Sequence, residues 1–288
     1  MEHKNEAIAS FTFTGYTDEA ETVTSRLSGG RTLGGEHFIR SDSDGEVARI
    51  ILARPPLNIL TIEMMEELNE VLRDFSDRPD LRALVLAAEG KAFSAGVAVE
   101  DHLGDRMKPM LAAFHQIFRY LYRLGCPTVA AVQGPALGGG AELATFCDLV
   151  IASEAATLGQ PEIRVGVFPP IAALCYPNRV GQARALQLLL SGEVISAREA
   201  ERIGLVDRVV PPEELEAAVA GALAKFTDKS AVVLRMTKRA VREARGQGFE
   251  AALAVLENRY QNELMRTEDA GEGLRAFVEK RPPVWKHR

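Results

Sequence analysis

Hydrophobic residues follow two patterns along the chain. One pattern is typical of strands and the other of helices. Short apolar, β-branched runs that end near glycine or proline predict buried strands. Five such runs lie at residues 46–53, 84–88, 128–132, 149–152 and 206–210. Apolar residues spaced three and four apart predict amphipathic helices. Four such stripes lie at residues 62–75, 107–124, 139–147 and 181–190. The pattern therefore predicts an α/β fold up to about residue 210.

The two ends of the chain differ from this α/β part. Four helical patterns follow it, at residues 213–226, 230–245, 249–266 and 268–279. We interpret residues 211–288 as a helical region that packs on the body or on a neighbouring subunit, because its apolar stripes are long. Residues 1–40 are polar, and we expect a flexible extension there, with FTF at 11–13 as a candidate edge strand. Residues 41–210 then form the core domain.

Local signals mark where two helices begin or end. Thr61 precedes the first apolar stripe and is a typical N-cap residue. Ser196 and Glu199 match the S-x-x-E capping box, and Gly204 stands where a C-terminal glycine belongs. These residues predict a short helix between 196 and 204.

The stretch TVAAVQGPALGGGAELATFCD at 128–148 predicts a strand, a glycine turn and a helix that begins near Gly139. Glycines let backbone N–H groups come close to a ligand, and the positive end of a helix favours negative charge. The phosphate-binding patterns GxGxxG and GxxxxGK[ST] are absent. An oxyanion site with Glu142 beside it fits better. The alternative is a tight strand–helix turn with a solvated glutamate.

A second carboxylate, Glu162, follows Glu142 by twenty residues, in a loop after the next predicted strand. One strand and its loop can return this residue to the same end of the sheet. Two carboxyl groups in one pocket can divide acid and base roles, because the pocket separates their pKa values. Taken alone, Glu162 reads as a solvated loop residue, and residues 93–98 read as a small-residue turn.

Composition excludes several classes of function. The chain has 288 residues, 47% of them hydrophobic, and a net charge of −6, which argues against nucleic acid as a partner. No apolar run is long enough to cross a membrane, and residues 1–40 lack the core of a signal peptide. The three cysteines show no CxxC spacing, so we expect a reducing, cytoplasmic location. No cluster has metal-ligand spacing, and no metal is expected.

Several spaced motifs together resemble the enoyl-CoA hydratase/isomerase (crotonase) family. They are LARPPLNIL, FSAGVAVEDH, AAVQGPALGGGAELATFCDLVIAS, GQPEIRVGVFPP, SAREAERIGLVDRVVP and EDAGEGLRAFVEKRPPVWKHR. The resemblance runs from about residue 46 to the end of the chain. It implies a spiral of ββα turns with a C-terminal helical trimerisation region. It also implies a homotrimer or a dimer of trimers, an acyl-CoA substrate, and no cofactor beyond the coenzyme A of that substrate.

The resemblance also implies roles for individual residues. The backbone N–H groups of Val97 and Gly139 would form the oxyanion hole, and Glu142 and Glu162 would position water and move its protons. The presence of both glutamates favours hydration over isomerisation. Coenzyme A would lie along residues 54–60 and 91–93. The expected acyl and CoA contacts are Arg54, Leu57, Lys91, Phe93, Ala95, Ala98, Val99, Leu137, Phe168 and Lys280. Lys286 is an alternative to Lys280, and His102 and His115 are more simply structural.

The sequence differs from those of common hydratases at two places that bear on the acyl group of the substrate. Ala98 and Val99 replace an Asp and an Ile or Leu, and the segment from Phe168 to Ala172 replaces a glycine-rich one. Proline stiffens this segment, and Phe168 and Ile171 make it bulky. These stretches look like the cyclohexa-1,5-diene-1-carbonyl-CoA hydratases of anaerobic aromatic degradation. The alternatives are a general enoyl-CoA hydratase, an isomerase or thioester hydrolase on the same fold, and a non-catalytic RNA-binding or scaffold protein.

Overall fold

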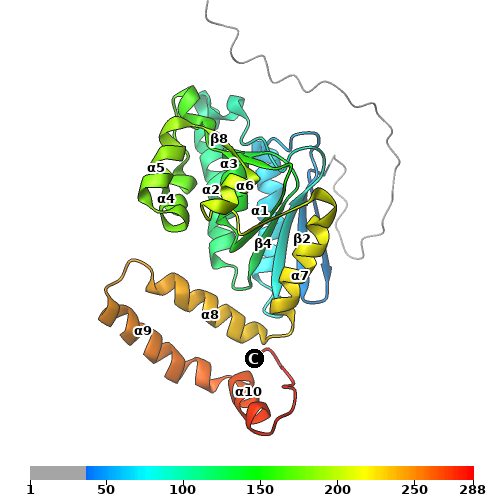
Figure 1. Ribbon diagram of the computed structural model, residues 1–288, viewed down its shortest axis with the longest axis vertical. Coiled ribbons are helices and arrows are strands. Elements are labelled where there is room, and N and C mark those ends of the chain that lie inside the picture. Colours follow the sequence, from blue (N-terminus) through cyan, green and yellow to red (C-terminus); the bar gives the residue numbers. More distant parts are fainter. Residues whose placement is uncertain (1–36) are drawn as a thin grey trace, which may run out of the picture. The chain divides into compact units, whose positions relative to one another are not determined.

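Two β-sheets organise the part of the chain that the computed structural model describes, residues 37–288 (Figure 1). The larger sheet has the strand order β1-β2-β3-β4-β6-β9, and the smaller one the order β5-β7-β8. The strands are β1 (Ile39–Asp44), β2 (Val47–Leu52), β3 (Ala83–Ala88), β4 (Thr128–Val132), β5 (Ala136–Leu137), β6 (Leu149–Ser153), β7 (Thr157–Gly159), β8 (Val194–Ser196) and β9 (Arg208–Val210). All five strands predicted from the sequence are confirmed. The candidate strand at 11–13 lies outside the described residues.

The larger sheet is parallel except at its first strand. β1 pairs antiparallel with β2, and Ile39 lies opposite Leu52. The pairs β2–β3, β3–β4, β4–β6 and β6–β9 are parallel. The expectation that the body begins with the strand at 46–53 was wrong, because β1 precedes it. Its sequence, IRSDSD, is polar because β1 is an edge strand with mostly exposed side chains, and this hid it from the hydrophobic pattern.

Ten helices connect and cover the strands within residues 37–288. They are α1 (Ile62–Ser76), α2 (Met107–Arg123), α3 (Gly139–Phe146), α4 (Pro170–Val180), α5 (Gln182–Ser191), α6 (Ala197–Arg202), α7 (Leu215–Thr227), α8 (Ala231–Ala244), α9 (Phe249–Asn262) and α10 (Glu268–Val278). The cap predictions are confirmed. Thr61 accepts from the Met64 amide, Ser196 accepts from the Glu199 amide at 3.2 Å, and Gly204 has φ +84° just after α6.

The central strands are apolar on both faces because each face is covered. Leu84 and Leu86 of β3 point into a core that includes residues of α1, α2 and α3. Val85 and Ala87 of the same strand point the other way, into a smaller core completed by α7. This two-sided burial explains why β3 and β4 read as continuous apolar runs rather than alternating ones.

The glycines and prolines of GQPEIRVGVFPP at 159–170 predict a loop, and this stretch contains a short helix and ends where α4 begins. Residues Pro161–Val165 form a 3₁₀ helix, and α4 begins at Pro170. Proline suits the first turn of a helix, because the amide hydrogen that it lacks has no partner there. Pro170, which the sequence suggested as part of a stiff loop, therefore starts α4. The smaller sheet was also missed, because strands of two and three residues carry too little pattern.

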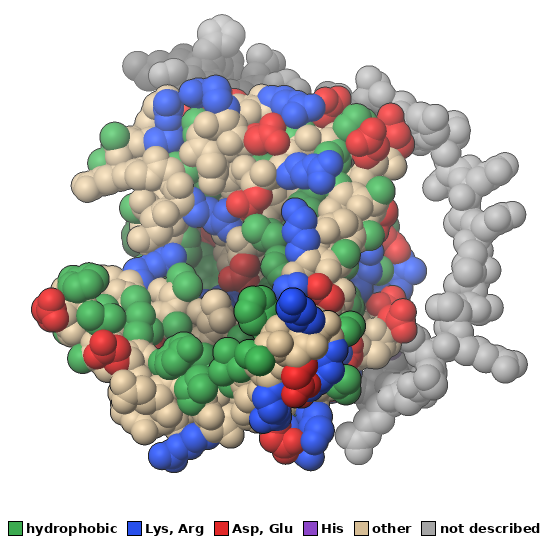
Figure 2. Space-filling model, turned by 60° about the horizontal axis from the view of Figure 1, so that its bottom comes forward, with side chains coloured by type: hydrophobic (Ala, Val, Ile, Leu, Met, Phe, Trp, Pro, Cys, Tyr) green, Lys and Arg blue, Asp and Glu red, His purple; other side chains and the backbone are tan. Residues whose placement is uncertain are grey.

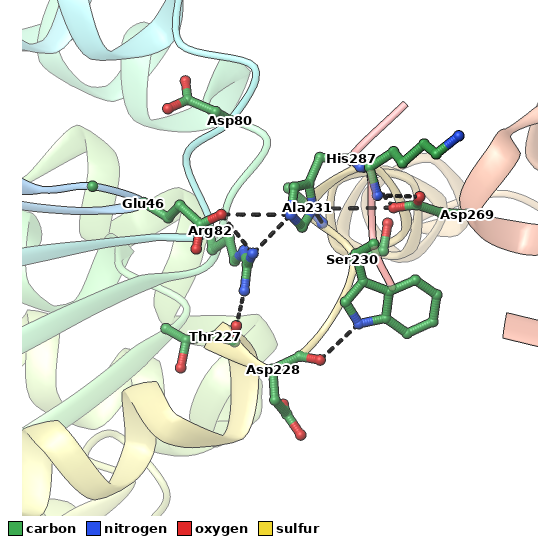
Figure 3. Close-up of polar contacts among 12 residues, drawn as sticks. Glu46, Asp80, Arg82, Thr227, Asp228, Ser230, Ala231, Asp269 and His287 are labelled. Carbon is green, nitrogen blue, oxygen red and sulfur yellow. Dashed lines mark hydrogen bonds and ion pairs between the residues drawn. The ribbon is translucent and has the colours of Figure 1, made fainter. Parts of the chain in front are cut away.

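The C-terminal end returns to the start of α8 and to the sheet. Figure 3 shows Arg82 between Glu46, the carbonyl of Thr227 and His287, with 2.7 Å from its Nη2 to the His287 Nε2. The backbone amides of Lys286 and His287 donate to Asp269 at 2.7 and 2.9 Å. The chain end is therefore held by α10 and by the edge of the larger sheet.

The last helices leave many apolar side chains exposed. Helices α9 and α10 carry exposed Phe249 and Phe277, and α8 carries exposed Val241. Figure 2, with the lower part of Figure 1 turned forward, shows hydrophobic side chains gathered on this face. In soluble proteins, contiguous exposed apolar area of this kind is typical of interaction surfaces. None of the helices formed by residues 37–288 is both long and apolar enough to cross a membrane.

Candidate active site

Glu142 is a buried carboxylic acid in the first turn of α3. It follows Gly138, whose φ of +52° and ψ of −128° turn the chain from β5 into the helix. Its side chain is 2% exposed, and its Oε1 accepts a 2.8 Å hydrogen bond from the Ala172 amide at the start of α4. Burial raises the pKa of Glu142 to about 8, the Ala172 amide opposes this rise, and the charge of Glu162 adds to it.

Glu162 lies on the other side of the same glycine turn. It belongs to the 3₁₀ helix that follows β7, and a Cβ atom placed on Gly138 would lie only 2.7 Å from its Oε1. Burial raises the pKa of this carboxyl group to about 7. The charge of Glu162 also acts on the Glu142 carboxyl group. The structure therefore brings together the two glutamates that the sequence singled out.

The segment around Val97 packs against the start of α3. A Cβ atom on Gly139 would lie 2.8 Å from the Val97 Cγ2, and one on Gly96 would lie 3.5 Å from the Gly139 nitrogen. Within residues 37–288, the hydrogen bonds that hold these two segments use neither the Val97 amide nor the Gly139 amide. The segment around Val97 and the start of α3 are thus in contact, and these two amides are left for another acceptor.

Buried polar residues that the sequence did not single out fix the loop before Val97. The Ser94 hydroxyl donates to the Asn58 carbonyl at 2.8 Å, and the Leu60 amide donates to the Gly96 carbonyl at 2.9 Å. Asn58 is fully buried, with its side-chain amide donating to the carbonyls of Glu89 and Ala92. Asn58 and Ser94 gave no signal in the sequence, because isolated small polar residues within two positions of Pro or Gly are typical of any loop.

The residues expected to contact substrate fall into several groups. Ala95, Ala98 and Leu137 line the loop and strand beside the glycine turn, and their amides bond to the carbonyls of Leu57, Leu60 and Ser94. Val99 and Phe168 are 61% and 70% exposed. Leu57 and Lys91 are exposed at the surface.

The side chains of three other residues expected to contact the substrate are buried, bonded to the protein or far from the glutamates. Phe93 is fully buried in the core, so its side chain packs there and is not open to a ligand. The Arg54 guanidinium donates to the Ile59 carbonyl at 2.9 Å and lies over the Phe38 ring. Lys280 follows α10, which Figure 1 shows at the opposite end of the molecule from α3. The folded chain by itself does not bring Lys280 to the glutamates.

Two histidines have structural surroundings. His102 Nδ1 lies 3.0 Å from the Ala98 carbonyl, so its ring is held by the loop after Val97. His115 lies within α2 and packs beside the Phe114 ring, and burial lowers its pKa. Within residues 37–288, no group of three or more His, Cys, Asp or Glu side chains is arranged to hold a metal ion.

The arrangement combines two main-chain amides on contacting segments with two carboxyl groups whose pKa values are raised to about 8 and about 7. Donors of this kind stabilise negative charge that develops on a carbonyl oxygen. Carboxyl groups with pKa values near neutral pH can give and take protons efficiently. The site is therefore suited to proton transfer next to a polarised carbonyl group.

Comparison with known proteins identifies the class to which this fold and site belong. Residues 42–288 match the family model described as enoyl-CoA hydratase/isomerase. An enoyl-CoA hydratase from Bacillus anthracis, solved at 1.8 Å, has the same fold, with a TM-score of 0.82 and 31% identity over 87% of this chain and all of that one. The fold is thus of the crotonase type. The chain belongs to the enoyl-CoA hydratase/isomerase family.

Two curated relatives are equally similar to the chain. The cyclohexa-1,5-dienecarbonyl-CoA hydratase of Thauera aromatica is 41% identical over 251 residues, which cover 86% of this chain and 95% of the relative. A probable enoyl-CoA hydratase of Rhizobium meliloti is 41% identical over 253 residues, which cover 86% of this chain and 97% of the relative.

Proposed function

We propose that the protein is a hydro-lyase that adds water to an α,β-unsaturated CoA thioester, with cyclohexa-1,5-diene-1-carbonyl-CoA as its substrate. The observation that carries this proposal is that Glu162 lies against Gly138 and interacts with Glu142, while the Val97 segment contacts the start of α3. No cofactor is required beyond the coenzyme A that the substrate contains.

The proposed reaction uses each part of the site once. The Val97 and Gly139 amides hold the thioester oxygen and stabilise the negative charge that develops on it. One glutamate, ionised, takes a proton from water while the water oxygen bonds to a carbon of the double bond. The other glutamate, protonated, gives its proton to the second carbon, and the displaced π electrons form the new C–H bond. A proton returned from the first glutamate to the second completes the cycle.

The choice of a cyclic substrate is supported by residues 168–170, which lead into α4. Phe168 is exposed, and Pro169 and Pro170 lead directly into α4, whose first turn binds Glu142. A proline-stiffened wall that carries a large aromatic side chain suits a compact ring better than a flexible acyl chain. The Thauera aromatica relative, which is named for this cyclic substrate, is 41% identical to the chain.

A general enoyl-CoA hydratase is the second candidate, because the Rhizobium meliloti relative is just as similar to the chain. The two functions share the same catalytic steps and differ only in the acyl group. A rate comparison with both substrates separates them.

The test is incubation of the purified protein with the cyclic dienoyl-CoA and with crotonyl-CoA in ¹⁸O-labelled water. A gain of one labelled water, with a higher kcat/KM for the cyclic substrate, supports the proposal. A higher kcat/KM for crotonyl-CoA supports the general hydratase. An unchanged product mass indicates an isomerase, and release of free coenzyme A indicates a thioester hydrolase. Either of these two results would refute hydration.

The proposal extends to assembly and location. We infer a homotrimer or a dimer of trimers, because α8 to α10 expose apolar side chains that a neighbouring copy can cover. Light scattering of the purified chain tests this assembly. The three cysteines are unpaired, which supports a reducing compartment such as the cytoplasm.

A further inference from the structure

Residues from three parts of the chain meet where α3 begins, and the reaction described above gives their side chains no role. A Cβ atom on Gly139 would lie 2.8 Å from the Val97 Cγ2, 3.0 Å from the Phe114 Cζ and 3.2 Å from the Phe114 Cε2. Phe114 belongs to α2 and is 3% exposed, and Val97 packs against the same core. A methyl group and the edge of a ring therefore fill the space that a side chain on residue 139 would need.

Two further rings hold the Phe114 ring in place. Phe118, one turn later in α2, meets Phe114 edge to face, with 4.9 Å between the ring centroids and 79° between the ring planes. Phe118 meets Phe146 in the same way, at 5.1 Å and 73°. Gly139 is the first residue of α3 and Phe146 is the last. The three rings therefore connect α2 to both ends of α3 and fix the Phe114 ring relative to this helix.

Side-chain packing, rather than hydrogen bonding, joins the Val97 segment to the start of α3. A hydrogen bond from the Leu137 amide to the Ser94 carbonyl, at 2.9 Å, precedes this contact along both segments. Among the residues that the structure describes, no hydrogen bond joins residues 95–98 to residues 138–142. The gap between the two segments therefore depends on the side chains that fill it.

We propose that Phe114 is a positioning residue, whose ring holds the Val97 segment and α3 at the spacing at which the Val97 and Gly139 amides reach one thioester oxygen. The inference rests on the proposed function, which assigns those two amides to that oxygen. Amide hydrogen bonds are made at about 2.7–3.2 Å and weaken beyond this range. The size of residue 114 therefore controls how strongly the thioester carbonyl group is polarised, and through it the rate of hydration.

Ordinary core packing by Phe114 makes a different prediction. Core packing alone makes loss of the ring destabilising and leaves a bound substrate unaffected. A positioning role adds weaker polarisation of the bound carbonyl group. This change lowers kcat more than it raises KM, because the charge on the oxygen is larger in the transition state than in the bound substrate. A measurement on the bound carbonyl group separates the two roles.

The first test replaces Phe114 and observes a bound thioester directly. The probe is butanoyl-CoA labelled with ¹³C at the thioester carbon, which has no double bond to hydrate, and its carbonyl stretch is read by isotope-edited infrared spectroscopy. Hydrogen bonds to the oxygen should place the band of the bound probe below that of the free probe. In Phe114→Leu the band should return part of the way. The kcat for hydration should fall about tenfold, because loss of a whole donor costs about 10²–10³ in rate.

Leu121→Ala is the matched control for this variant. Leu121 lies two turns after Phe114 in α2, is 2% exposed and belongs to the same core. Its truncation leaves a cavity and lowers stability, but it should leave the carbonyl band and kcat unchanged. Urea unfolding compares the stability of the two variants.

The second test moves a methyl group from one side of the contact to the other. Gly139→Ala places a Cβ atom against the Val97 Cγ2 and should push the two segments apart. Val97→Ala removes that obstacle. The double variant should therefore have a kcat about tenfold higher than the product of the two single effects. Where Phe114→Leu does not fold, this comparison decides the question.

The outcomes separate this inference from the proposed function. A carbonyl band at the same position in Phe114→Leu and in the unsubstituted protein would overturn the positioning role, even if the protein hydrates thioesters rapidly. An equal shift in Leu121→Ala, or additive effects of Gly139→Ala and Val97→Ala, would do the same. A band that responds to Phe114→Leu in a protein that hydrates neither thioester would support the inference and reject the hydratase.

Discussion

The Glu142 carboxylate accepts a 2.8 Å hydrogen bond from the amide of Ala172, the third residue of α4. Amides in the first turn of a helix have no partner within the helix and attract negative charge. The helix that the sequence did not predict therefore supports one glutamate through its amide. It also brings the Tyr176 hydroxyl within 2.8 Å of the side-chain amide of Gln160, two residues before Glu162.

Replacement of either glutamate by glutamine should nearly abolish hydration. Glu142→Gln and Glu162→Gln remove a proton-transfer group while they keep the shape of the side chain, and such groups contribute about 10²–10⁴ in rate. Glu70→Gln, at an exposed position of α1, is the matched control and should keep full activity. Steady-state hydration rates and circular dichroism measure both effects. A folded Glu142 or Glu162 variant with the original rate would remove that residue from the proposed mechanism.

The raised pKa of Glu142 should make the protein less stable as the pH rises. Between its ordinary pKa of 4.5 and its folded value of about 8, the folded state holds a proton that the unfolded state has lost. Stability therefore falls with pH across this window and levels off above it. The Glu142→Gln variant has no such proton to lose. Compared with the unsubstituted protein, the variant should therefore gain no free energy of unfolding below pH 4.5. At pH 9 its gain should reach a few kcal/mol, at about 1.4 kcal/mol per pKa unit.

Urea unfolding of Glu142→Gln and of the unsubstituted protein at several pH values tests this linkage. The Glu70→Gln variant serves again as the control, because it makes the same substitution at an exposed position of α1. An advantage of Glu142→Gln that stays constant from pH 4.5 to pH 9 would contradict the raised pKa.

The rate of hydration should have a bell-shaped pH dependence. One glutamate must be ionised and the other protonated, and their pKa values are raised to about 7 for Glu162 and about 8 for Glu142. Because the groups interact, these values belong to the pair, and kcat/KM should peak between them and fall tenfold per unit on both sides. A kcat/KM that stays level from pH 6 to pH 9 would argue against a pair that shares one proton.

The strands and helices with strong patterns were predictable, and the elements that complete the site were not. The run at 128–132 and the stripe at 62–75 are long enough for burial to impose a clear period, and both elements form where predicted. Strand β5 has two residues, and its place beside β7 depends on residues twenty-two positions away. Such short elements follow from tertiary contacts that no local pattern records.

The same limit applies to the site. The glutamates and the glycine turn were predictable because their residue types suit a particular chemistry. Tyr176 was not, because a tyrosine in an apolar stretch reads as core, and only the fold shows its hydroxyl beside Gln160. Phe93 was misplaced for the opposite reason. Its segment borders the site, while its side chain turns into the core.

Gly138 should not tolerate a side chain. Its backbone, with φ of +52° and ψ of −128°, lies in a region that residues other than glycine rarely adopt, and a Cβ atom there would meet the Glu162 Oε1 at 2.7 Å. Gly138→Ala should displace this carboxylate and lower kcat by at least about tenfold. Gly221→Ala, in α7 where a Cβ meets nothing within 4 Å, is the control and should be neutral or slightly stabilising. Full activity in Gly138→Ala would show that Glu162 need not lie over the turn.

Loss of the Lys238 side-chain charge should loosen the attachment of α8 to the body. Lys238 is 9% exposed and pairs with Asp148 at 2.5 Å, and its Nζ also donates to the Cys126 carbonyl at 2.6 Å. Lys238→Met keeps the length of the side chain but leaves Asp148 without its closest cation. Lys238 is buried but Asp148 is partly exposed and keeps other donors, so we expect a destabilisation of about 1–3 kcal/mol.

Those remaining donors are the Thr128 amide and hydroxyl and the Arg242 guanidinium, which hold Asp148 at the end of β4. The matched control is Lys225→Met on the exposed face of α7, which should change the free energy of unfolding by less than about 0.5 kcal/mol. Urea unfolding at one protein concentration compares the two variants, because α8 belongs to the region proposed for subunit contacts. Equal stability of Lys238→Met and Lys225→Met would mean that the apolar contacts of α8, rather than this ion pair, attach it to the sheet.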